Sequence, residues 1–217
     1  MKNDKIFPNV LSVRVISNLH PDLMPHLTLP KEHKSIGIIT SDMDDPTYVA
    51  LDVATKSAEV SVVYAKSMYA GAANASSKLQ GEVIGIISGK TPDAVKSGMD
   101  AALTHLKQET CFISANEDDS IPYFAHTVSR TGSFLSKLAG IREGEPLAYL
   151  IAPPLEAIYG LDAALKASDV RMVSFYGPPS ETNFGGGLLT GSQSACKAAA
   201  TAFAQAVQQI ANNPKEM

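Results

Sequence analysis

The sequence predicts an α+β fold built from two tandem copies of one domain. The main observation is an internal repeat, because residues 51–63 and 161–173 are identical at six of thirteen positions without a gap. The offset of 110 residues is half of the 217-residue chain, so the repeating unit is half of the molecule. Both halves also alternate apolar runs with alanine-rich segments, which indicates strands and helices. We therefore expect domains at residues 1–109 and 110–217, each with helices on one face of a mainly antiparallel sheet.

In the first half, apolar and polar residues alternate from Val10 to Ile16, which predicts a strand. The Asp45-Pro46 pair predicts a helix start, with Asp45 as N-cap and Pro46 at the first helical position, where its missing N–H costs nothing. The other expected elements of this half are a proline-interrupted segment at 21–29, strands at 35–40, 60–64 and 83–88, a long loop at 67–81, and helices at 48–58 and 91–106.

The second half is expected to repeat this alternation. One longer helix is predicted for residues 122–138, closed by Gly140, and Ser192 is predicted to cap the last helix. The remaining expected elements are strands at 111–114, 147–152, 170–176 and 187–190, helices at 156–168 and 192–211, and a loop at 177–186.

Composition excludes several classes of protein. Apolar residues make up 45% of the chain and charged residues 18%, which is a globular balance, and the net charge of -4 argues against nucleic acid or anionic membranes as partners. Cys111 and Cys196 are too few for a disulfide framework, so a reduced cytosolic protein is expected. Residues 1–18 are too charged and interrupted for a signal peptide or a membrane span.

The stretch from Gly85 to Thr91 resembles a phosphate-binding P-loop, but it has three residues between its glycines where that motif needs four. Pro92 also removes a backbone N–H, so a strand end followed by a Thr91 N-cap is favoured. The five histidines lack the spacing of a metal site, and no nucleophile or acid/base pair stands out. We therefore predict that the protein is not an enzyme and binds no metal.

Acidic residues and glycines are the candidates for binding. Asp42, Asp44 and Asp45 lie at a strand-to-helix junction and can bind a cation or an amine, with Glu82 as a partner. The alternative is that carboxylates are simply favoured at a helix N-terminus. The Gly185–Gly187 run either lets the backbone approach a ligand or makes a mobile loop.

A family resemblance rests on several segments. Residues 159–173, an alanine-rich helix with a lysine, an acidic residue and a following apolar strand, resemble the signature of the bacterial microcompartment (BMC) shell domain. Nearly the whole chain is similar to the ethanolamine-utilisation members of that family. The segments that carry this closer likeness are 128–133, 152–157, 178–183 and 189–193.

The resemblance implies two tandem, circularly permuted BMC domains in a chain that assembles as a homotrimer. The trimer is expected to form a pseudo-hexameric tile, which packs beside other shell proteins in the shell of a microcompartment in the cytoplasm. It implies a gated central pore for metabolites or cofactors, lined by loops at 69–81 and 180–187, and a small pore in each subunit that binds ethanolamine. No cofactor is required, and cobalamin binding or passage stays open.

The alternative function is a regulatory small-molecule-binding domain that does not assemble. The residues implied for the gate are Tyr69, Gly71, Asn74, Glu181, Asn183, Phe184, Gly185 and Gly186, and those for ethanolamine are Asp44, Asp45 and Glu82 for its ammonium, with Phe112 and Thr182 as lining.

Overall fold

The computed structural model describes residues 2–67, 82–178, 180 and 183–215, which form two compact units. The N-terminal unit contains Pro8–Thr110 and Gly132–Leu135, and the C-terminal unit contains the rest. Strand β1 (Lys5–Ile6) therefore belongs to the C-terminal unit, although the sequence placed it in the first domain. The reason is its antiparallel pairing with β6 (Phe112–Ser114).

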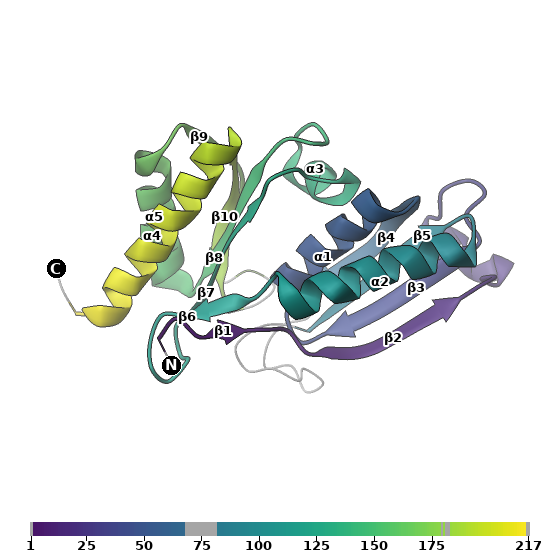
Figure 1. Ribbon diagram of the computed structural model, residues 1–217, viewed down its shortest axis with the longest axis horizontal. Helices are drawn as coiled ribbons and strands as arrows, with labels where there is room; N and C mark the ends of the chain where they lie inside the picture. Colours follow the sequence, from purple (N-terminus) through teal and green to yellow (C-terminus); the bar gives the residue numbers. More distant parts are fainter. Residues whose placement is uncertain (1, 68–81, 179, 181–182, 216–217) are drawn as a thin grey trace. The chain divides into compact units, whose positions relative to one another are not determined.

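The N-terminal unit is a four-stranded antiparallel sheet in the order β2-β3-β5-β4. Two helices cover one face of this sheet (Figure 1), and their apolar sides meet the strands in a core that includes Ile39, Leu51 and Ile87. The elements of this unit are β2 (Val10–Ile16), two short 3₁₀ helices η1 (Pro21–Leu23) and η2 (Pro25–Leu27), β3 (Ser35–Ser41), α1 (Asp44–Ser57), β4 (Val60–Ser67), β5 (Val83–Gly89) and α2 (Pro92–Gln108).

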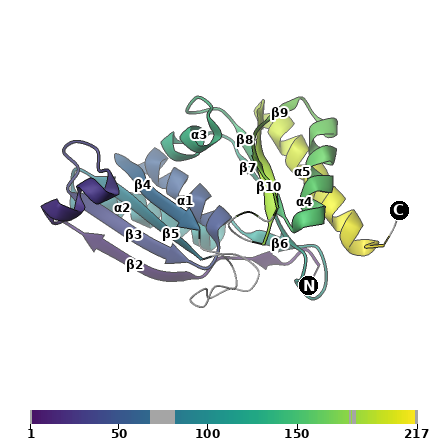
Figure 2. The same cartoon turned by 180° about the vertical axis from the view of Figure 1, so that it is seen from behind.

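The C-terminal unit has a six-stranded sheet in the order β1-β6-β7-β8-β10-β9. Helices α4 and α5 lie side by side on one face of it (Figure 2), and small side chains such as Ala157, Ala164 and Ala199 allow their close packing. The elements are β7 (Pro122–Val128), β8 (Leu147–Ala152), α4 (Pro154–Ala167), β9 (Val170–Tyr176), β10 (Gly185–Gly191) and α5 (Gln193–Asn212), and α3 (Ser133–Ala139) contributes residues to both units.

The predicted duplication and the α+β class are confirmed by the topology. The strand orders β2-β3-β5-β4 and β7-β8-β10-β9 are the same, and the helices follow at equivalent points of the chain. The segment from η1 to η2 corresponds to α3, since Ser133 lies 112 residues after Pro21 and both segments have seven residues. Each ends before a left-handed residue, Thr28 with φ 51° and Gly140 with φ 62°.

The long helix predicted at 122–138 is wrong. Residues 122–128 form β7, which pairs with both β6 and β8, and only 133–139 are helical. Aromatic and β-branched residues such as Tyr123, Phe124 and Val128 fit a buried central strand, and the neighbouring strands satisfy its backbone. The predicted closing role of Gly140 agrees with its positive φ.

Two of the predicted N-cap residues, Thr91 and Ser192, are confirmed, and the third, Asp45, is not. Thr91 and Ser192 cap α2 and α5 by accepting hydrogen bonds from the N–H of Ala94 at 3.2 Å and of Ala195 at 3.1 Å. The supposed P-loop is thus a strand end and a cap. The Asp45 cap is wrong, because α1 already begins at Asp44 and its N-cap residue, Met43, makes no side-chain cap bond.

The side chain of Asp52, in α1, is completely buried, and its partners come from far along the chain. Its two oxygens accept hydrogen bonds from the N–H of Gly132 at 2.7 Å and of Leu135 at 2.8 Å, at the start of α3. Lys56 adds an ion pair at 3.0 Å. A Cβ on Gly132 would overlap the Thr55 hydroxyl and lie 2.8 Å from the Asp52 carbonyl oxygen, so only glycine allows this approach.

We expect Asp52→Ala to lower the free energy of unfolding by about 3 to 5 kcal/mol, because two buried N–H groups lose their charged acceptor. The measurement is chemical denaturation of the full chain. Lys56→Met is the matched comparison, since it removes only the partly exposed ion-pair partner and leaves both N–H bonds to Asp52 in place, so it should cost less than Asp52→Ala. Equal losses in the two variants would contradict a dominant role for the N–H bonds.

Candidate functional site

Four carboxylates gather at one end of the N-terminal sheet. Ser41 at the end of β3 pairs with Val83 at the start of β5, so Asp42 and Glu82 follow and precede these two central strands at the same end of the sheet. The next residues begin α1, which places Asp44 and Asp45 in its first turn. The sequence analysis predicted that Asp44, Asp45 and Glu82 bind one ligand together. The pairing of β3 with β5 brings the segments that carry these residues to the same end of the sheet.

These carboxylates are unusually buried for acidic residues. Asp44 is 6% exposed, Asp45 7% and Glu82 9%. Burial of a charge is costly unless hydrogen bonds or opposite charges compensate for it. Part of the compensation is local, because an oxygen of Asp44 accepts a hydrogen bond from the Asp45 N–H at 2.9 Å and the start of α1 favours negative charge. The start of α1 therefore lowers the cost of burying these two aspartates.

Asp42 has a structural partner that the sequence did not reveal. One of its oxygens accepts a hydrogen bond from the Asn9 backbone N–H at 2.7 Å, and the other accepts one from the Asn9 side-chain amide at 2.8 Å. This pair ties the chain just before β2 to the end of β3. The two hydrogen bonds with Asn9 therefore give Asp42 a role in the fold.

Phe112 lies in the C-terminal unit and is fully buried there. Its ring centroid is 5.4 Å from that of Phe124 and 6.0 Å from that of Phe184, so packing among aromatic rings explains this residue. Thr182, the other predicted lining residue, lies outside the described residues.

The expected gate residues divide into two groups. Tyr69, Gly71, Asn74 and Glu181 lie outside the described residues. Asn183 is exposed, whereas Phe184 is only 5% exposed and packs on Phe112.

The two remaining gate residues, Gly185 and Gly186, belong to a strand. The expectation that β10 begins at residue 187 is wrong, because both pair with β8. Gly186 has φ 155°, and a Cβ there would overlap the Leu150 carbonyl oxygen. Gly186 therefore lets the backbone of β10 approach the backbone of the neighbouring strand β8 closely.

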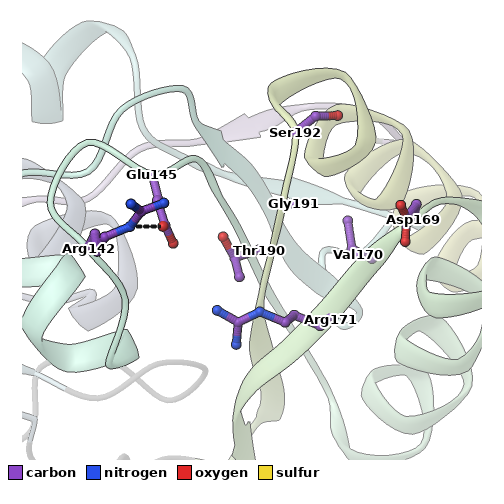
Figure 3. Close-up of a pocket in the computed structure, with 8 residues that line it drawn as sticks. All are labelled: Arg142, Glu145, Asp169, Val170, Arg171, Thr190, Gly191 and Ser192. Carbon is purple, nitrogen blue, oxygen red and sulfur yellow. Dashed lines mark hydrogen bonds and ion pairs between the residues drawn. The ribbon is translucent and has the colours of Figure 1, made fainter.

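A separate pocket of about 510 Å³ lies in the C-terminal unit, where the sequence predicted no binding site (Figure 3). On one side Arg142 donates a hydrogen bond to Glu145 at 2.8 Å, and Arg171 lies near Thr190 (Figure 3). The Thr190 hydroxyl donates to the Pro146 carbonyl at 2.7 Å. Two arginines and two acids line the pocket, so it favours neither ionic sign.

Metal ligands, thiols and helix lengths in the described residues add no further candidate site. No group of three or more His, Cys, Asp or Glu residues among them is arranged to hold a metal. Burial raises the pKa of both the Cys111 and the Cys196 thiol, which keeps them protonated and weakly nucleophilic. None of the helices in the described part of the chain has the length and apolar character to cross a membrane.

Comparison with known proteins shows the family. The BMC domain family model matches residues 35–118. The bacterial microcompartment shell protein EutL of Clostridium perfringens is 66% identical over 214 residues, which cover 99% of both chains. EutL of Escherichia coli is 50% identical over 97% of this chain and 96% of the relative. This chain belongs to the EutL family of bacterial microcompartment shell proteins.

The EutL fold is confirmed by solved structures. The crystal structure of EutL from Leptotrichia buccalis matches with a TM-score of 0.95 at 66% identity and covers 100% of both chains. A trimeric shell protein, PduB, has the same fold at a TM-score of 0.80 and 19% identity. The chain is thus a shell protein rather than an enzyme, and its place is the shell of a bacterial microcompartment. The alternative of a regulatory domain is not supported.

We expect Gly186→Ala to lower the free energy of unfolding by about 3 kcal/mol or more, because the methyl group meets the β8 backbone and φ is unfavourable. Thermal or chemical denaturation measures the loss. Gly140→Asn is the control, since Gly140 also has a positive φ but no atom within 4 Å of a Cβ, and asparagine tolerates the left-handed region. An unchanged stability of Gly186→Ala would refute the strained approach.

Proposed function

We propose that three copies of this shell protein form a pseudo-hexameric tile with a gated central pore, and that each copy binds ethanolamine at Asp44, Asp45 and Glu82. The tile takes its place in the shell of an ethanolamine-utilising microcompartment beside other shell proteins. The observation that carries the proposal is the duplicated topology, because one chain supplies two copies of the same sheet and helix arrangement.

The assembly follows from this duplication. Three chains with two similar units each present six similar units, and closed cyclic symmetry is the usual arrangement of identical chains. A six-sided tile fills a plane without gaps, which is what a shell facet needs. The PduB structure, whose title describes a trimeric shell protein, supports this arrangement through its shared fold.

The ligand follows from the buried carboxylates. Ethanolamine is protonated at neutral pH, and its ammonium group donates three hydrogen bonds. Each charge-assisted bond to a carboxylate contributes roughly 1.5 to 3 kcal/mol, from which the cost of association is subtracted. The result is binding in the millimolar range, which suits a transport pore because the ligand must also leave.

The gate is proposed to lie in the loops at 69–81 and 180–184, the second of which leads into β10. A ligand changes the state of such a gate only when it binds one state better than the other. The described end of the second loop gives the gate a fixed base, since Phe184 packs on Phe112 and Gly185 pairs with β8.

The assembly is tested by light scattering and electron microscopy of the purified full chain. We expect a mass of three chains and six-sided particles or sheets. A monodisperse monomer at the concentrations used for microscopy would contradict the tile.

The ligand is tested by calorimetric titration with ethanolamine. We expect Asp44→Asn and Glu82→Gln to weaken binding about tenfold or more each, because each removes a charged acceptor. Asp93→Asn, an exposed first-turn acid of α2, is the matched control and should bind as the unchanged protein does. Ethylene glycol has no ammonium and should not bind. Unchanged affinity in both carboxylate variants would reject the site.

A further inference from the structure

The pocket shown in Figure 3 lies at the end of the C-terminal sheet where α5 begins, and the repeat identifies the equivalent place in the N-terminal unit. Gly191, the last residue of β10, pairs with Val170 at the start of β9. In the N-terminal unit Gly89, the last residue of β5, pairs with Val60 at the start of β4. The two strand ends are therefore built alike.

A turn of the same form contributes to both places. The N–H of its fourth residue donates a hydrogen bond to the carbonyl of its first, at 3.2 Å in residues 142–145 and at 3.0 Å in residues 30–33. The third residue has a positive φ in each turn, 90° at Gly144 and 71° at Glu32. The backbone frame around the pocket is thus present twice in the chain.

Two side chains bridge this frame in the N-terminal unit. Lys90 follows the last residue of β5, and its Nζ lies 2.7 Å from an Oε atom of Glu32. Beside this ion pair, a ring nitrogen of His33 and the Ser88 hydroxyl are hydrogen-bonded at 2.8 Å. These contacts join the strand end to the turn.

Neither partner of the Lys90–Glu32 bridge has a counterpart in the C-terminal unit. There Gly191 is followed at once by the N-cap residue Ser192, so no residue corresponds to Lys90, which precedes the N-cap of α2. The place of Glu32 is taken by Gly144, which has no side chain. The frame therefore stays open here, as a pocket of about 510 Å³.

The lining of the open pocket keeps one unengaged charge of each sign. Arg142 and Glu145 are already paired, at 2.8 Å. The side chains of Arg171 and Asp169 make no hydrogen bond or ion pair with the rest of the described chain. Figure 3 shows them on either side of Val170. A ligand that carries both charges therefore fits this lining better than an ion of either sign.

The start of α5 supports the anionic end of such a ligand. Ser192 lies in the lining, and the first turn of α5 contains no acidic residue. In the equivalent helix α2, Asp93 occupies the first turn. The N-terminus of a helix favours negative charge, which α2 receives from its own sequence and α5 does not.

We propose that this pocket binds a small zwitterion, a molecule with an ammonium group and a carboxylate or phosphate group. Arg171 donates paired hydrogen bonds to the anionic group, and Asp169 accepts hydrogen bonds from the ammonium. Both side chains are exposed, so each ion pair is weak and the dissociation constant lies in the millimolar range. The site does not depend on the proposed tile or ethanolamine site, because every lining residue belongs to the C-terminal unit.

The test is a ligand-observed NMR titration of the full chain with zwitterions of increasing length: glycine, β-alanine, γ-aminobutyrate and O-phosphoethanolamine. Butyrate and butylamine are the matched probes with one charge each. We expect at least one zwitterion to bind about threefold or more tightly than both of these. The amino acids and the phosphate ester distinguish the two kinds of anionic group. A repeat in Asp44→Asn removes a carboxylate of the proposed ethanolamine site.

Two substitutions test the residues. Arg171→Gln and Asp169→Asn should each weaken the zwitterion about threefold or more, since each removes one exposed ion pair. Arg14→Gln and Asp22→Asn are the matched controls, because they remove exposed charges of the N-terminal unit, and they should leave binding unchanged.

A further variant copies the bridge of the N-terminal unit into the pocket, as Gly144→Glu with a lysine inserted between Gly191 and Ser192. We expect this variant to lose zwitterion binding while its mass in light scattering stays that of the unchanged protein.

The outcomes decide the proposal without reference to the tile. Zwitterion binding that is unchanged in both Arg171→Gln and Asp169→Asn overturns the site. Equal affinity for the zwitterions and for butyrate or butylamine overturns the ligand with two charges. Weaker binding in the pocket variants, with no change in the controls, supports both.

Discussion

The arrangement around Asp52 is the interaction on which the N-terminal unit depends most. A buried carboxylate holds the first turn of a segment that arrives 80 residues later in the chain, and Gly132 permits the close approach. The hydrogen bonds are strong because one partner is charged and water is excluded. The equivalent aspartate of the second repeat, Asp162, lies in solvent. One residue retained in both copies thus has a structural role in one and a surface role in the other.

The acidic site is a product of the same architecture. Antiparallel pairing of β3 with β5 brings Glu82 to the end of the sheet where α1 begins, and the helix start favours the negative charge of the two aspartates. The strands and helices shared by the repeats form a rigid frame. Asp44, Asp45 and Glu82 lie at the ends of these elements, where residues can change with less loss of packing than in the core.

Much of the fold was predictable because its signals are local. The caps at Thr91 and Ser192, the alternating pattern of β2 and the repeat itself all lie within short windows of sequence. The strand β7 was missed, since its stability comes from β6 and β8 on either side. The Asn9 contact of Asp42 was missed for the same reason. For the candidate site, residue type and position indicated the acids, but nothing local indicated which of them the fold already uses.

The different burial of Asp52 and Asp162 has a consequence for how duplicated shell proteins evolve. Fusion of two domains makes contacts between segments of different repeats intramolecular, so these contacts form at a high effective concentration. Such a contact can keep a buried charge such as Asp52. The counterpart Asp162 is 60% exposed and pairs with Lys166 at the surface. Gene fusion therefore relaxes the requirement that both faces of a repeat be soluble alone, and leaves the two copies free to diverge.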